Sequence, residues 1–105
     1  MLLQTDNYEQ AMVSLIKLQM SDPSNLDYLR PLAIVSEQDG DKLAAIKYRK
    51  AMEPLDPWNL DNYLRLGYLY RDTGDQDNMK KILEKIISIA PNHIIATTAL
   101  QQLRS

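Results

Sequence analysis

Apolar residues recur along most of the chain at steps of three and four positions, and short polar segments separate these runs. Such spacing places the apolar side chains on one face of an α-helix. The clearest two runs follow one another between residues 59 and 89. The pattern predicts an all-α protein with six helices, over residues 7–21, 25–38, 41–53, 59–73, 76–89 and 92–103.

Proline and glycine separate the predicted helices at a repeated interval of 34 residues. Pro23, Pro57 and Pro91 follow one another at this spacing, and so do Gly40 and Gly74. Proline disfavours the helical conformation in the residue before it, and glycine adopts the left-handed conformation that commonly ends a helix. Each unit of 34 residues is therefore predicted to form two helices, with proline between units and glycine within a unit.

Side chains that cap helices stand near the start of several predicted helices. Asp6, Asp41, Asn59 and Asp75 are of the types that accept hydrogen bonds from the first backbone N–H groups. Pro31 falls inside a predicted helix, where it removes one backbone donor and clashes with the preceding turn. We expect either a kink or a late helix start at that point.

Composition limits the classes of function. The chain has 105 residues and a net charge of -2, with 12 basic and 14 acidic side chains. A nucleic-acid or membrane-surface binder would concentrate Lys and Arg, so neither class is expected. The chain has no cysteine, which excludes disulfides and thiolate metal sites. No apolar run reaches the roughly 18–20 residues of a membrane span.

Candidate catalytic chemistry is sparse. His93 is the only histidine, and it is interpreted as an exposed residue in a turn or first helical turn. Asp72, Asp75 and Asp77 surround Gly74, but the twelve-residue calcium pattern with its closing Glu is missing. A phosphate-binding glycine loop is also missing. The sequence therefore predicts no enzymatic activity, no metal site and no cofactor.

The best unit resembles the tetratricopeptide repeat family, whose pattern is W-x2-L-G-x2-Y, then A-x3-F, then P. The matching residues are Tyr63, Leu66, Gly67, Tyr70, Met79, Leu83 and Pro91. The resemblance implies a right-handed superhelical solenoid of antiparallel helices, with Gly67 small because two helices touch there. It implies one domain over 1–105, made of a half repeat at 5–23, repeats at 24–57 and 58–91, and a capping helix at 92–105.

The resemblance also implies a function, because first helices of tetratricopeptide repeats line a concave groove that holds a partner peptide or protein segment. In this family, fixed positions in the first helix of each repeat face the groove. This register, counted from the start of each repeat, assigns to the groove Asp27, Arg30, Ile34, Glu37, Gln38, Asp61, Leu64, Arg65, Tyr68, Arg71, Asp72, Ile95, Thr98 and Gln102. Tyr68 with Arg65 and Arg71 is the group expected to dominate binding. The alternative is that Tyr68 is half-buried while both arginines are solvated or pair with Asp61 and Asp72.

Two further features of the sequence bear on the expected partner and on the surface. Some family members clamp the C-terminal carboxylate of chaperone tails with Lys and Asn at set groove positions. Ile34 and Ile95 occupy two of those positions here, so chaperone-tail binding is not expected. Trp58 follows Pro57 and is expected to pack against apolar neighbours at its helix start, the alternative being an exposed binding residue.

A second class of function stays open, in which the chain is a structural or assembly segment. The half repeat at the N-terminus leaves Met12, Leu15 and Ile16 with little cover, which suggests an excised piece of a longer protein or a homodimer through this face. One unit is also similar to the repeat tails of bacterial O-antigen ligase or polymerase-like membrane proteins. That similarity implies a soluble appendage of a glycan-transferring enzyme, the alternative location being the cytoplasm.

Overall fold

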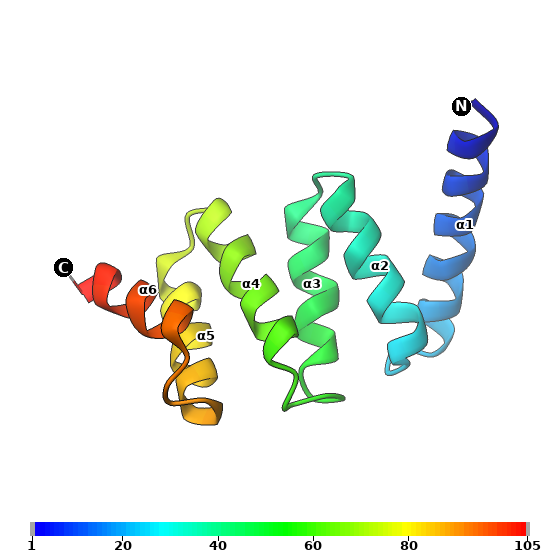
Figure 1. The fold of residues 1–105 in the computed structure, drawn as a ribbon. Helices are drawn as coiled ribbons and strands as arrows, with labels where there is room; N and C mark the ends of the chain where they lie inside the picture. The colour runs from blue at the N-terminus through cyan, green and yellow to red at the C-terminus, as the bar shows by residue number, and fades with distance from the viewer. Residues whose placement is uncertain (1, 105) are drawn as a thin grey trace. The chain divides into compact units, whose positions relative to one another are not determined.

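The computed structural model describes the backbone of residues 2–104 and the side chains of residues 9–103. This part of the chain is all-α, as predicted, and contains six helices (Figure 1). They are α1 (Leu2–Ser21), α2 (Leu26–Gln38), α3 (Lys42–Met52), α4 (Leu60–Asp72), α5 (Gln76–Ile89) and α6 (Ile94–Arg104). Within the described residues, none of these helices is long and apolar enough to cross a membrane. The contacts divide the chain into two compact units, the first ending at Leu55 and the second beginning at Asp56.

In the first unit, α2 packs against both α1 and α3 (Figure 1). Its core contains buried apolar side chains from α2 and α3, namely Leu29, Leu32, Ala33, Tyr48 and Met52. Met12 and Leu15 of α1 are partly buried against this core. The helix α1 thus contributes only one side to the packing, and several of its other apolar side chains remain exposed.

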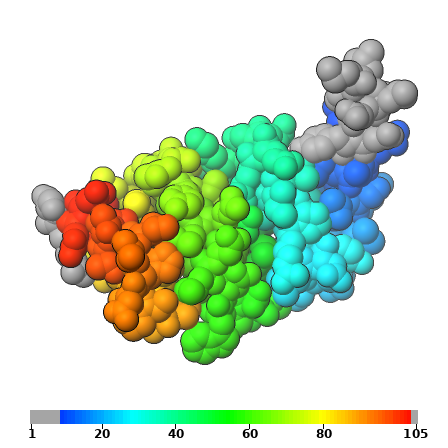
Figure 2. Space-filling view, viewed as in Figure 1, coloured from blue at the N-terminus to red at the C-terminus, as the bar shows by residue number. Residues whose placement is uncertain are grey.

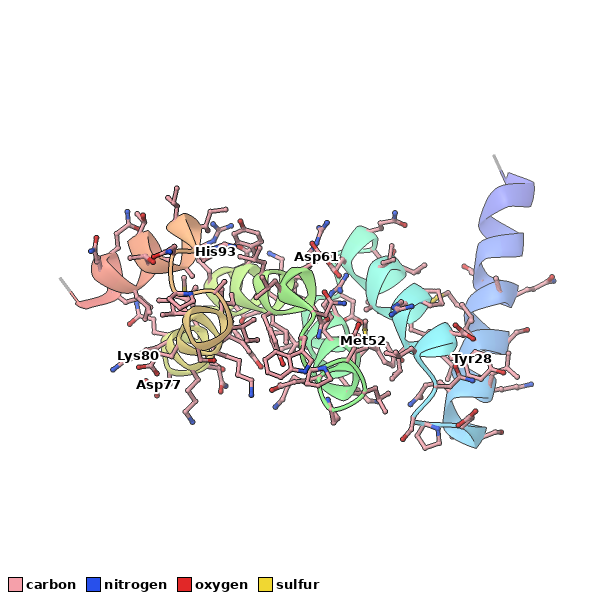
Figure 3. All side chains as sticks on the ribbon, turned by 60° about the horizontal axis from the view of Figure 1, so that its bottom comes forward. Tyr28, Met52, Asp61, Asp77, Lys80 and His93 are labelled. Atoms are coloured by element: carbon pink, nitrogen blue, oxygen red, sulfur yellow. The ribbon has the colours of Figure 1, made fainter. Side chains whose placement is uncertain are left out.

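In the second unit, α5 packs against both α4 and α6. Tyr63, Leu66 and Ile86 are fully buried. Gly67 is buried where α4 and α5 meet, and a Cβ atom on it would lie 3.4 Å from Cγ2 of Ile82. The two helices therefore touch at this position, as predicted, and a methyl group there would be in ordinary van der Waals contact with Ile82. On the outer side of α5, Asp77 and Lys80 are exposed (Figure 3).

The predicted helix boundaries at Gly40 and Gly74 and at three of the four predicted capping residues are confirmed. Gly40 and Gly74 have φ angles of 78° and 76°, the left-handed region that glycine adopts without a Cβ clash. The side-chain oxygens of Asp41, Asn59 and Asp75 each accept a hydrogen bond from the backbone N–H three residues later. These bonds satisfy donors that have no partner within the helix.

Three local predictions are wrong. The helix α1 begins at Leu2, so Asp6 lies inside it and does not mark its start. The helix α2 begins at Leu26 and continues through Pro31, so the helix does not start late. The side chain of Trp58 is 74% exposed and does not pack against apolar neighbours at the start of α4. The kink at Pro31 and the handedness of the solenoid stay predictions.

Candidate functional site

The second unit fixes the position of α4 through bonds at its N-terminus. The hydroxyl group of the buried Tyr63 donates a hydrogen bond to the carbonyl oxygen of Pro57, at 2.7 Å. Asn59 caps the helix by accepting from the backbone N–H of Asn62, at 3.0 Å. Because Tyr63 lies one turn into the helix, these two bonds tie α4 to the turn that precedes it. The outward face of α4 is thereby held in a defined direction.

His93 plays the corresponding part for α6. It stands at the start of that helix (Figure 3), and its Nδ1 atom accepts a hydrogen bond from the backbone N–H of Ala96, at 3.3 Å. The hydroxyl group of Thr97 donates to the carbonyl oxygen of His93, at 2.8 Å. The side chain is half-buried and caps α6, so the prediction of an exposed histidine is wrong.

An apolar groove lies on the second unit, and we call it the α4–α6 groove. Side chains of α4 and α6 form its two walls, and two side chains of α5 lie between them. The groove has a volume of about 360 Å³. Its lining residues are Leu64, Gly67, Tyr68, Arg71, Met79, Leu83, Ile94, Ile95, Thr98, Ala99 and Gln102. Figure 2 shows α6, in orange and red, at the surface of this unit.

The groove brings together six residues that register had assigned to it. They are Leu64, Tyr68, Arg71, Ile95, Thr98 and Gln102. Sequence reasoning missed Met79 and Leu83, because it interpreted both as repeat core. Their spacing could have identified them, because Met79 and Leu83 are four residues apart and so lie one turn apart on α5. That helix packs against both α4 and α6, which form the two walls. Sequence reasoning also missed Ile94, which is highly exposed next to the predicted Ile95.

Tyr68 and Arg71 form the polar edge of this groove. The side chain of Tyr68 is 40% exposed, and the guanidinium carbon of Arg71 lies 5.2 Å from its ring centroid. Nε and Nη2 of Arg71 both donate to Oδ1 of Asp72, at 3.2 Å. Both partners of that ion pair are substantially exposed, so it stabilises the fold little.

The remaining predicted residues lie elsewhere. Arg65 pairs with Asp61 across 3.7 Å on the exposed side of α4, and neither residue lines the groove. The pairing of both arginines with aspartates matches the alternative interpretation of these side chains. Asp27, Arg30, Ile34 and Gln38 are exposed on α2 of the first unit, and their place in a groove stays a prediction.

Glu37 has a different environment from the one that register predicted. Its Oε1 atom accepts a hydrogen bond from Nε of Arg49, at 2.6 Å, which joins α2 to α3. The side chains are 20% and 8% exposed, respectively. Glu37 therefore neutralises the buried guanidinium group of Arg49, and this ion pair holds α2 against α3 in the first unit. Among the described residues, no group of three or more His, Asp or Glu side chains is arranged to hold a metal ion.

Comparison with known proteins supports the resemblance to the tetratricopeptide repeat family. Residues 60–93 match the family model described as tetratricopeptide repeat. This segment is therefore similar to a repeat of a generally non-catalytic type, and within each unit the helices pack sequentially, as in tetratricopeptide repeats. No curated protein matches the sequence. Nothing among the matches supports an origin in O-antigen ligase.

The solved structures that are similar to the chain include the following two. The crystal structure of MamA has a TM-score of 0.73 and 27% sequence identity, over 90% of this chain. The chain spans 56% of the length of that MamA chain. The first tetratricopeptide repeat domain of Spaghetti (RPAP3), bound to the HSP90 peptide SRMEEVD, has a TM-score of 0.68 and 20% identity. That match covers 97% of this chain and 81% of the other, and it shows the fold.

Proposed function

We propose that the chain is a protein-interaction module that binds a peptide or protein segment in the α4–α6 groove. The observation that carries the proposal is the convergence of six register-predicted residues on one apolar groove at the surface. Concave sites lined by apolar side chains, with a few polar groups at defined points, are typical of binding sites. The RPAP3 domain binds its peptide on the same fold, which supports the class of function but not the identity of a partner.

Affinity capture from the lysate of the source cell tests this proposal. The double variant Tyr68→Ala, Arg71→Glu removes the polar edge of the groove. The matched control is Lys81→Glu, which makes the same reversal of charge on the exposed side of α5. We expect a partner that wild type and the control retain and the double variant loses. Equal recovery by all three proteins would contradict a binding role for the groove.

A second candidate function, self-association through α1, is favoured by a separate observation. Val13 and Ile16 stand at the register positions of Lys47 and Lys50 in α3, and both apolar side chains are exposed. The corresponding residues of α5 are Lys81 and Glu84, which stay exposed although α5 has a neighbour on either side. A further repeat helix would therefore leave Val13 and Ile16 in solvent, whereas a second copy of α1 would bury them.

Sedimentation velocity distinguishes this second candidate. If α1 mediates self-association, wild type sediments as a dimer and the variant Val13→Ser, Ile16→Ser sediments as a monomer. Both substituted side chains are exposed, so the fold is preserved. A monomeric wild type at high concentration would exclude self-association through this face. Neither result bears on the groove, because the substitutions lie in the first unit.

A further inference from the structure

The α4–α6 groove combines an apolar interior with a single charge. Met79 and Leu83 line it from α5, and Leu64 and Ile95 line it from α4 and α6. Arg71 is the one charged side chain among the lining residues that the structure describes. An apolar side chain of a partner would bury its surface here, and the charged group that it would meet at the edge is a guanidinium group that pairs with Asp72.

Arg71 retains donors for a second carboxylate. A guanidinium group has five N–H donors, and the bonds to Asp72 use one from Nε and one from Nη2. The pair with Asp72 is exposed to water, which weakens its attraction. A carboxylate seated in the groove would be partly desolvated and would form a stronger, charge-assisted hydrogen bond to the same group.

The groove continues past Arg71. A neighbouring depression is lined by Gly74, Gln76 and Leu103, and it shares Arg71, Met79, Ala99 and Gln102 with the α4–α6 groove. Arg71 therefore lies between two connected hollows and not at a closed end. A chain that ended at Arg71 would leave the second hollow empty. The continuation favours an acidic side chain within a segment over a C-terminal carboxylate.

We propose that the partner segment is internal and has an aliphatic or methionine side chain within about three residues of Asp or Glu. The inference rests on the proposed function. From Leu64 to Arg71 the groove follows two turns of α4, roughly 10 Å at 1.5 Å per residue. An extended segment covers that length in about three residues, at about 3.3 Å each. The apolar side chain would occupy the interior and the carboxylate would contact Arg71.

Selection from two phage-displayed libraries of random peptides tests the proposal. One library displays nonapeptides within a loop, and the other displays them with a free C-terminus. We expect enrichment from the loop library of an apolar residue close to Asp or Glu. Enrichment without an acidic residue, or only from the free C-terminal library, would overturn this inference and leave the groove's binding role intact. If neither library yields peptides that Tyr68→Ala, Arg71→Glu fails to bind, the proposed function itself fails.

A double-mutant cycle on the best enriched peptide then locates the carboxylate. Arg71→Gln and replacement of the peptide's acidic residue by its amide should each raise Kd by roughly tenfold, as expected for the loss of one hydrogen bond between charged groups at a partly exposed site. Together they should raise it little further, because both changes remove one interaction. Independent, multiplying effects would overturn the assignment of Arg71. Lys81→Gln is the matched control and should leave Kd unchanged.

Discussion

The guanidinium group of Arg71 lies over the ring of Tyr68, with 5.2 Å between the guanidinium carbon and the ring centroid. The two residues are three positions apart on α4, a spacing that places side chains on the same face of a helix. Each side chain thus limits the freedom of the other at the edge of the groove. Holding both groups in place before binding lowers the entropy that a partner would otherwise lose.

The first prediction concerns this pair. Tyr68→Phe keeps the ring beneath Arg71 and should leave partner binding within about twofold, because the described structure gives the hydroxyl group no role in the pair. Tyr68→Leu removes the ring and should weaken binding by roughly tenfold. Isothermal titration with a peptide selected as above measures both. Equal affinities of the two variants would show that the ring does not position Arg71.

The second prediction concerns Gly67, whose missing Cβ would lie 3.4 Å from Ile82. Gly67→Ala fits at van der Waals contact and should stabilise the fold by up to about 1 kcal/mol through helix propensity. Gly67→Leu must displace Ile82 or enter the groove, and should destabilise by about 1–3 kcal/mol. Urea unfolding measures both free energies.

Gly74 supplies the control for the second prediction. A Cβ at Gly74 would meet open space, but its φ angle of 76° strains any other residue. Gly74→Ala should therefore destabilise by about 1 kcal/mol from the backbone alone. If Gly67→Ala were the more harmful of the two alanine variants, the close packing of α4 on α5 would be tighter than the contact distance indicates.

The third prediction concerns the ion pair between Glu37 and Arg49, whose side chains are 20% and 8% exposed. Glu37→Ala removes a carboxylate that neutralises a buried cation and should cost about 2–3 kcal/mol of unfolding free energy. Replacing both residues, as in Glu37→Leu with Arg49→Met, should recover most of the lost unfolding free energy, because neither charge of the pair then remains. Urea unfolding of the single and double variants checks this. Purely additive losses would contradict a direct interaction.

The fourth prediction concerns the cap of α6. His93→Ala removes the acceptor for the N–H of Ala96 and should cost about 1 kcal/mol, whereas His93→Asn keeps an acceptor and should cost less. Amide hydrogen exchange in the first turn of α6 should rise in the alanine variant. Exchange that is unchanged there would show that the imidazole does not cap the helix.

Most helix boundaries could be predicted because the residues that set them act locally. Five of the six helices begin and end within two residues of their predicted bounds. Gly40 and Gly74 adopt left-handed backbone conformations, and Asp41, Asn59 and Asp75 bond to N–H groups only three residues away. Such interactions need no knowledge of the rest of the fold. The start of α1 was missed because a capping residue type is not by itself a cap.

The candidate site was predictable only in part. Register identified the outward positions of first helices, and therefore Tyr68, Arg71 and Ile95. It did not reveal that Glu37, at an outward position, turns toward α3 to reach Arg49. That contact depends on an arginine at a position where the repeat pattern has an apolar residue. The buried guanidinium group of Arg49 needs a carboxylate partner, and Glu37 supplies it by turning toward α3 although the repeat pattern places Glu37 on the outward face.

A partner that occupies the α4–α6 groove would be captured in place by site-specific photo-cross-linking in the source cell. A photoreactive benzoylphenylalanine would replace Ile95, a groove residue that is 49% exposed, and separately Leu43, an exposed residue on α3 in the first unit. We expect an adduct with a different protein from position 95, lost with Arg71→Glu, and none from position 43. Adducts of equal yield from both positions, or none from position 95, would contradict binding of a partner in the groove.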